Sequence, residues 1–158
     1  MAKEKFSLSR ASVEDMDEYE YLRRMFLVGL KICTEKKAEA AYIKYKKWAK
    51  KQSRAGKWFG FLIRNEAGKT VSGGTLWFKE AQPNQICSEW RMPYLLSLYT
   101  KPSYRRKGLA ALIVKEVIKL AKKKRYSMIE LHASKQGKKL YKKLGFVATS
   151  EMRYKIKS

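Results

Sequence analysis

Two periodic patterns of hydrophobic residues run along the chain, and they predict both helices and strands. Apolar positions three and four residues apart indicate helices, with lysines and other polar residues on the opposite face. Ser12 and Asp15 form a capping-box pattern before the first helix, and Gly145 supplies a stop for the last one. The predicted helices cover residues 12–31, 34–56, 109–125 and 134–145.

Alternating or continuously apolar segments predict the strands. A glycine-containing turn at 66–69 joins two of them as a hairpin. The predicted strands cover residues 5–9, 57–65, 70–80, 92–100, 126–133 and 146–157, the last with only a loose alternation. The order β-α-α-β-β-β-α-β-α-β predicts one α/β domain over residues 1–158, a mixed sheet with helices on its faces, since no repeat or linker interrupts it.

Composition narrows the class of protein. The chain of 158 residues is 45% hydrophobic, and no apolar run approaches the roughly 18 residues that span a membrane. The N-terminus has charges but no hydrophobic signal region, so we expect a cytoplasmic protein without a membrane partner. Cys33, Cys87 and the single His132 show no metal-binding spacing, so we expect no metal site.

The net charge of +23 is extreme and uneven. Residues 101–158 hold 18 Lys and Arg against 3 Asp and Glu, a net +15, whereas residues 1–100 hold 19 against 11, a net +8. The C-terminal third should attract anions over a long range, so nucleic acid, a phosphorylated cofactor and an acidic partner are all compatible with it. A lysine-rich surface that only keeps the protein soluble is the alternative explanation.

The segment KPSYRRKGLAALIV, residues 101–114, places three cations and a glycine at the start of a helix. Helix N-termini usually carry acidic or hydroxyl side chains, because the helix dipole is positive there. The cations at 105–107 reverse that rule, while Gly108 and the small Ala110 admit a ligand close to the backbone. A bound polyphosphate explains the arrangement, because the first N–H groups of a helix have no internal partner. Neither a P-loop nor a GxGxxG fingerprint is present.

The residues Arg105-x-x-Gly108-x-Ala110 match the pattern [Arg/Gln]-x-x-Gly-x-[Gly/Ala] of the acetyl-CoA loop in GNAT N-acetyltransferases. Downstream, LHASKQGKKLYKKLGF, residues 131–146, is similar to the second signature of that family, a strand and then a small helix with Tyr141. The predicted order of strands and helices from residue 5 to 157 also matches that family, so the chain resembles the GNAT superfamily along nearly its whole length. The resemblance implies a mixed, mostly antiparallel central sheet of six to seven strands with about four helices.

The resemblance also implies a reaction, the transfer of an acetyl group from acetyl-CoA to a primary amine by direct attack. The strand at 96–100 would part from its neighbour, and an N–H near Leu98 or Tyr99 would polarise the thioester carbonyl. Tyr141 would protonate the departing CoA thiolate. Ser134 stands where the family often has a longer Asn, which leaves its cofactor contact open. The implied cofactor-binding residues are Leu98, Tyr99, Thr100, Arg105, Arg106, Lys107, Gly108, Leu109, Ala110 and Ser134.

The residues do not define the general base or the acceptor. Glu89 precedes the central strand and is the candidate base, with Glu130 or a chain of waters as alternatives. The acceptor would be an amine on a small molecule or a protein, and the net charge favours one that is otherwise neutral or anionic. Acidic residues between Glu14 and Glu20 could line an amine pocket, although helix capping explains several of them.

Two other functions fit the same sequence. A nucleic-acid-binding module would use the basic C-terminal face, with aromatic residues such as Tyr42 and Trp48 stacking on bases. A GNAT-like protein that binds CoA without turnover would explain the lack of an obvious base. In an enzyme, nucleic-acid association through the basic surface would be weak, and the chain could be a monomer or a homodimer.

Overall fold

The computed structural model describes residues 4–83 and 90–156, and an open sheet of five strands lies at its centre. In chain order the elements are β1 (Phe6–Ala11), α1 (Met16–Gly29), α2 (Glu35–Arg54), β2 (Trp58–Asn65), β3 (Thr70–Glu80), β4 (Arg91–Thr100), a 3-10 turn (Pro102–Tyr104), α3 (Leu109–Lys123), β5 (Glu130–Leu131) and α4 (Lys138–Lys143). Within the described ranges, no helix is both long and apolar enough to cross a membrane.

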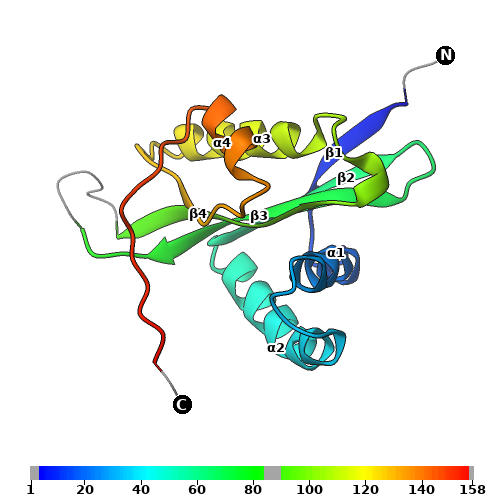
Figure 1. The fold of residues 1–158 in the computed structure, drawn as a ribbon, viewed down its shortest axis with the longest axis horizontal. Coiled ribbons are helices and arrows are strands. Elements are labelled where there is room, and N and C mark those ends of the chain that lie inside the picture. The colour runs from blue at the N-terminus through cyan, green and yellow to red at the C-terminus, as the bar shows by residue number, and fades with distance from the viewer. Residues whose placement is uncertain (1–3, 84–89, 157–158) are drawn as a thin grey trace.

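The strands lie in the order β1-β2-β3-β4-β5, so neighbours in the sheet are also neighbours in the sequence. Each pair is antiparallel except β4 and β5, which run parallel and are connected through α3. Figure 1 shows α3 and α4 on one face of the sheet and α1 and α2 on the other. The basic α3 segment and the acidic first helix therefore lie on opposite sides of the sheet.

The face under α3 holds the larger hydrophobic core. Phe61 of β2 and Leu76 of β3 pack with Ile113 and Val117 of α3, and each of the four is at most 1% exposed. Ile113 and Val117 are four residues apart, which places them on one side of the helix. Leu109, the first residue of α3, is buried in the same cluster, so the start of the helix is fixed above the sheet.

The opposite face is covered by α1 and α2 through a second cluster that is rich in aromatic rings. Tyr19 and Leu22 of α1 pack there with Trp58 of β2 and Tyr99 of β4. The rings of Tyr19 and Trp58 meet edge to face with their centroids 5.3 Å apart. The Tyr19 hydroxyl also hydrogen-bonds Thr75 of β3, which satisfies two buried polar groups. These contacts hold α1 against β3 and β4.

The structure places the start of α1 later than predicted and the start of α2 close to the predicted position. Ser12 donates its N–H and its hydroxyl to the Asp15 carboxylate at 2.7 and 2.9 Å, but this pair forms a turn, and α1 begins only at Met16. The start of α2 is close to the predicted position, and Thr34 caps it there, because its hydroxyl accepts the N–H of Lys37. The prediction of four helices is confirmed for the described residues.

The prediction of six to seven strands is wrong for the described residues, which form five. In the segment 126–133, only Glu130–Leu131 pairs with β4, opposite Tyr94 and Leu95. Just beyond these partners, β4 changes its register with β3. A strand that bends at an irregularity offers a new neighbour no continuous edge, so β5 stays short.

The segment 146–156, also predicted as a strand, forms no regular structure. Its side chains Val147, Met152, Tyr154 and Ile156 are 84–93% exposed. Alternation gives such a segment one apolar face, but a strand also needs the edge of another strand as a partner. The two-residue β5 is too short to provide that edge. The class of the fold is nevertheless as predicted, a mixed α/β sheet covered by helices on both faces.

Candidate active site

The loop between β4 and α3 has an unusual backbone. After the 3-10 turn, Arg106 has a φ of 63° and Gly108 has a φ of 80°, so two of three successive residues are left-handed. A non-glycine residue rarely adopts this conformation, and it is enriched where a loop clamps a ligand. A Cβ built on Gly108 would meet no protein atom within 4 Å. The space beside Gly108 is therefore open to a ligand and is not filled by packing.

The N-terminus of α3 has no partner of its own within the described chain. No side chain caps it, and its first turn holds no acidic residue. The first bond within the helix runs from the Leu112 N–H to the Gly108 carbonyl, which leaves the amides of Leu109 and Ala110 without a helical acceptor. By contrast, Thr34 caps α2. The start of α3 therefore has the character of an anion site.

The three cations of this loop are held differently. Arg105 turns back and donates its Nε–H to the carbonyl of Thr100 at 3.1 Å, and its guanidinium lies 5.7 Å from the Tyr99 ring centroid. Lys107 forms an ion pair with Glu4. Within residues 4–83 and 90–156, the side chain of Arg106 has no hydrogen-bond or ion-pair partner. Arg105 thus stabilises the end of β4, while Arg106 is available to a ligand.

The end of β4 carries an irregularity in its pairing with β3. Thr75 of β3 pairs with Leu96 and Gly73 with Tyr99, so β4 holds an extra residue between them, and Ser97 has a φ of 51°. Pairing with β5 reaches only Leu95. Beyond that point, β4 has no strand partner on the β5 side within the described residues, which agrees with the predicted parting of the strands at 96–100.

The backbone of β4 alternates in direction beyond the irregularity. The carbonyl of Tyr99 accepts the Ser72 hydroxyl at 2.9 Å, and the N–H of Lys101 bonds the carbonyl of Val71, so residues 99 and 101 face β3. Successive residues of a strand direct their N–H groups to opposite edges. Leu98 and Thr100 therefore face the edge that β5 leaves uncovered. Of the two donors that the sequence suggested, Leu98 has the better orientation.

Tyr141 extends from α4 into the core beside α3. Its ring packs edge to face on Phe146 at 5.7 Å between centroids. Burial raises the pKa of Tyr141 to about 12, so the phenol stays protonated at neutral pH. A Cβ on Gly137 would lie 2.9 Å from Cε2 of this ring. Glycine at 137 is therefore what leaves room for the tyrosine, a role that its place in the sequence motif did not reveal.

The other candidates are placed less favourably. Ser134 accepts the N–H of Gly137 with its hydroxyl at 3.1 Å, so this side chain supports the turn before α4. Glu130 forms an ion pair with Lys79 at 2.9 Å, and His132 is exposed. Glu89, the candidate base, lies outside the described residues. No group of His, Cys, Asp and Glu within the described ranges could hold a metal ion.

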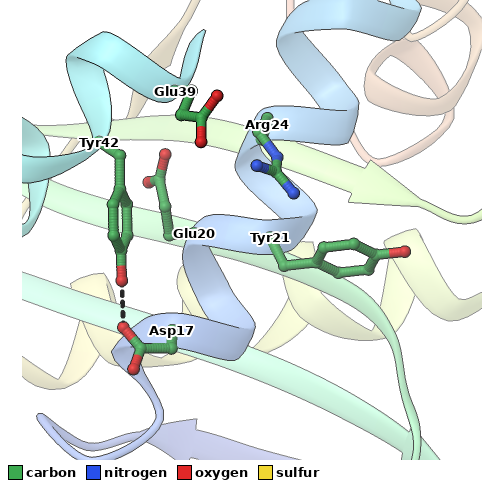
Figure 2. A pocket seen from close by; sticks show the side chains of 6 residues that line it. All are labelled: Asp17, Glu20, Tyr21, Arg24, Glu39 and Tyr42. Carbon is green, nitrogen blue, oxygen red and sulfur yellow. Dashed lines mark hydrogen bonds between the residues drawn. The ribbon is translucent and has the colours of Figure 1, made fainter. Parts of the chain in front are cut away.

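A second candidate region lies between α1 and α2. The sequence predicted only part of it, the acidic residues of α1 that could line an amine pocket. Figure 2 shows Asp17, Glu20 and Tyr21 of α1 lining a pocket with Tyr42 of α2. Arg24 and Glu39 complete the lining. Nothing in the order of residues pairs positions 20 and 39, because the contact depends on how two helices pack. Asp15 and Glu18 do not line this pocket and bind Arg64 instead.

Solved structures with the same fold come from several organisms. A GCN5-related N-acetyltransferase from Ralstonia eutropha JMP134 has a TM-score of 0.86 at 21% identity, over 96% of this chain and 99% of that one. A predicted acetyltransferase from Clostridium acetobutylicum, solved with acetyl-CoA, has a TM-score of 0.83 at 20% identity, over 96% of both chains. An aminoglycoside antibiotic 6'-N-acetyltransferase from Acinetobacter baumannii has a TM-score of 0.73 at 15% identity, over 98% and 99%.

At these identities the likeness shows the fold alone, and no curated protein matches the sequence significantly. The family is shown by the sequence itself, because the model of the acetyltransferase (GNAT) domain matches residues 31–156. That range includes the left-handed loop, the open start of α3 and Tyr141. The chain belongs to the GNAT acetyltransferase family, whose co-substrate is acetyl-CoA.

Proposed function

We propose that the protein is an acetyl-CoA-dependent N-acetyltransferase that acts on a primary amine. The observation that carries the proposal is the uncapped start of α3, with left-handed Gly108 beside it and the uncovered edge of β4 next to it. The free edge of β4 and the anion site at α3 follow one another along the chain. A cofactor with a diphosphate and an extended amide arm needs both, the anion site for the diphosphate and the strand edge for the arm.

The residues of the loop fit this cofactor. The amides of residues 106–110 would hold the diphosphate, and Gly108 leaves room for it because a Cβ there would point into open space. Arg106 would add charge-assisted hydrogen bonds, since its side chain has no partner in the described chain. Acetyl-CoA supplies the activated acetyl group. The protein fixes its position and provides the donors that the reaction needs.

Two groups would then act on the reacting atoms. The N–H of Leu98 faces the uncovered edge of β4 and would stabilise negative charge on the thioester oxygen. The phenol of Tyr141 would hydrogen-bond the leaving sulfur. A phenol with a pKa of about 12 is a weaker acid than an ordinary thiol, whose pKa is roughly 8.5. Tyr141 therefore stabilises the thiolate mainly as a hydrogen-bond donor, and the proton lost by the amine completes the thiol.

Calorimetric titration with acetyl-CoA tests the proposal. We expect micromolar binding by the wild type and at least roughly tenfold weaker binding by Gly108→Glu, because the carboxylate would occupy the anion site. Glu66→Gln, which alters a charge in the β2–β3 turn, is the control and should bind normally. Absence of acetyl-CoA binding, with tight and salt-sensitive binding of a short DNA duplex, would contradict the proposal and support a nucleic-acid module.

A second experiment tests catalysis apart from binding. Tyr141→Phe keeps the ring contact with Phe146 and removes only the hydroxyl. We expect acetyl-CoA affinity to stay the same and turnover with an amine acceptor to fall roughly 100-fold, in the range of one lost acid–base group. Unchanged turnover at every pH tested would remove Tyr141 from the mechanism.

A further inference from the structure

The pocket between α1 and α2 is lined mainly by acidic side chains, although the protein is strongly basic. It has a volume of about 250 Å³ and is lined by three carboxylates, two tyrosines and one arginine. This is slightly below the roughly 300–1,000 Å³ of pockets for drug-sized ligands, so the space suits a small molecule and not a folded chain. Figure 2 shows the carboxylates of Glu20 and Glu39 in the space between the two helices, with Tyr42 beside them.

Glu20 is the residue that points to a ligand. It is 3% exposed, and its Oε2 atom is buried without a hydrogen-bond partner among residues 4–83 and 90–156. Its other oxygen accepts a hydrogen bond from Arg23 at 3.3 Å. A buried carboxylate oxygen without a donor is costly, and native structures rarely keep one without a reason. An ammonium group in the pocket would supply the missing donor.

The remaining charges leave the pocket with spare acceptors. Asp17 is already satisfied by the hydroxyl of Tyr42 and by Lys46. Arg24 is paired outside the lining, with Glu35 at 3.2 Å. Glu39 has no hydrogen-bond or ion-pair partner within the described residues. Two carboxylates, Glu20 and Glu39, can therefore receive a cation without displacing one of the protein's own strong ion pairs.

The two tyrosine rings of the pocket already lie beside ammonium groups. The Nζ of Lys46 is 5.4 Å from the ring centroid of Tyr42, and the Nζ of Lys101 is 5.1 Å from that of Tyr21. Aromatic faces attract cations at this distance. Both rings are thus taken by lysines of the protein, and the groups left for the ammonium of a ligand are the carboxylates of Glu20 and Glu39.

The pocket is also next to the uncovered end of β4. Lys101, which lies beside Tyr21, is the residue directly after β4. Glu20 follows Tyr19, so their Cα atoms are about 3.8 Å apart. Tyr19 itself binds Thr75 opposite the irregularity in β4. A short molecule held at Glu20 could thus present another part of itself to the end of β4.

We propose that the α1–α2 pocket binds an ammonium group of the acceptor that is not the one acetylated, so that the acceptor is a small molecule with at least two amines. This inference rests on the proposed function, because that function is what makes the second amine of the acceptor the acetylated one. The net charge of the chain favoured a neutral or anionic acceptor. The acidic pocket is a local exception to the positive surface and would accept a cationic one.

Thermal unfolding of the full chain tests the pocket without any acetyl transfer. The probes are 1,4-diaminobutane and n-butylamine, with chloride concentration and ionic strength matched by NaCl and with MgCl₂ as an inorganic dication. We expect the diamine to raise the Tm of the wild type, and the dependence on concentration to give a dissociation constant at least roughly tenfold below that of the monoamine. Equal effects of diamine, monoamine and Mg²⁺ would overturn the proposal.

Two variants locate the binding. Glu20→Gln and Glu39→Gln should each weaken diamine binding roughly tenfold or more, whereas Glu116→Gln, which removes the same charge from α3, should not change it. Glu20→Gln also removes a buried charge, so it should fold at least as well as the wild type. Normal diamine binding by both pocket variants would overturn the assignment. A lysine-containing peptide that competes with the diamine for Glu20 would overturn the restriction to small molecules.

Kinetics separate this proposal from the proposed function. With acetyl-CoA present, Glu20→Gln should raise KM for the diamine at least roughly tenfold and leave KM for acetyl-CoA unchanged. If the wild type binds the diamine through Glu20 but does not bind acetyl-CoA, the proposed function fails and the cation site stands. If acetyl-CoA is turned over equally well with diamine and monoamine, the cation site fails and the proposed function stands.

Discussion

The two faces of the sheet differ in what they leave unpaired. Among the described residues of the α3 face, the amides of Leu109 and Ala110 are donors without a helical acceptor, and Arg106 is a cation without a partner. On the α1–α2 face, Oε2 of Glu20 is an acceptor that receives no donor from the part of the chain that the structure describes. Unsatisfied groups of opposite kind therefore lie on opposite sides of β4. The comparison teaches that missing partners indicate a site better than the net charge of +23 does, because lysines lie on the helices of both faces and the charge does not distinguish them.

The largest predicted effect concerns the donor side. Gly108→Ala puts a Cβ on a residue with a φ of 80°, which should lower the free energy of unfolding by about 1–2 kcal/mol. The same Cβ enters the space that we assign to the diphosphate, so acetyl-CoA should bind roughly tenfold more weakly or worse. Denaturant unfolding and calorimetry measure the two effects separately.

Gly68→Ala is the matched control for that substitution. Gly68 has a φ of 72°, and a Cβ there also meets nothing within 4 Å, but the residue lies in the β2–β3 turn. It should lose similar stability and keep its acetyl-CoA affinity. Equal loss of affinity in both variants would mean that strain in the fold, and not access of the ligand, explains the result for Gly108.

The second prediction concerns the room beside Tyr141. Gly137→Ala places a methyl group 2.9 Å from the ring and 3.3 Å from the Ser134 hydroxyl. Because the backbone at 137 is right-handed, alanine can adopt it without backbone strain. We expect turnover to fall roughly tenfold as the phenol moves, with acetyl-CoA affinity retained. Turnover equal to that of the wild type would show that the ring adjusts.

The third prediction concerns the acceptor side and its dependence on pH. Burial raises the pKa of Glu20 above its ordinary value of 4.5, partly offset by Arg23. A carboxyl with a raised folded-state pKa contributes most to stability below 4.5 and loses that contribution as pH rises through the folded-state value. Glu20→Gln should therefore raise the free energy of unfolding by about 1 kcal/mol at neutral pH.

The same difference should disappear in acid, below the ordinary pKa, because both the glutamate and the glutamine are then neutral in the folded and the unfolded chain. Urea titrations at several pH values measure it. A glutamine variant that is less stable at neutral pH would show that Glu20 is fully compensated in the free protein, and the case for a cation in the pocket would weaken.

The smallest predicted effect again concerns the donor side. Lys107 is paired with Glu4, so a diphosphate must compete with that carboxylate for the lysine. Glu4→Gln should tighten acetyl-CoA binding roughly twofold to fivefold, in line with the modest strength of exposed ion pairs. Calorimetry at low and high salt measures the change, which should shrink as salt screens the pair. An unchanged affinity at low salt would show that Lys107 is not a cofactor ligand.

The sequence predicted those parts of the molecule that depend on local rules. A glycine and three cations before an apolar helix indicated the loop at Gly108, and this residue has a left-handed conformation in the structure. The β2–β3 hairpin and the four helices followed from periodicity in the same way. Each of these features is specified by residues that are close together in the chain.

Features that depend on distant partners were not predicted. The segment 146–156 has a strand pattern, but whether a strand forms is decided by the edge that β5 offers. Glu20 and Glu39 line the same pocket from two different helices, and the order of residues does not indicate that they lie close together. Glu89 stays a prediction, because it lies outside the described residues.

The exposed C-terminal segment has a practical consequence for limited proteolysis. Arg153 and Lys155 lie there among side chains that are almost fully exposed, without the backbone hydrogen bonds that protect a helix or strand. Trypsin, which cleaves after Lys and Arg, should therefore cut this segment first despite the many other basic residues of the chain. Such a cut would leave α3, α4 and the α1–α2 pocket in place. A cleaved sample that still binds acetyl-CoA would show that the fold does not depend on the last residues of the chain.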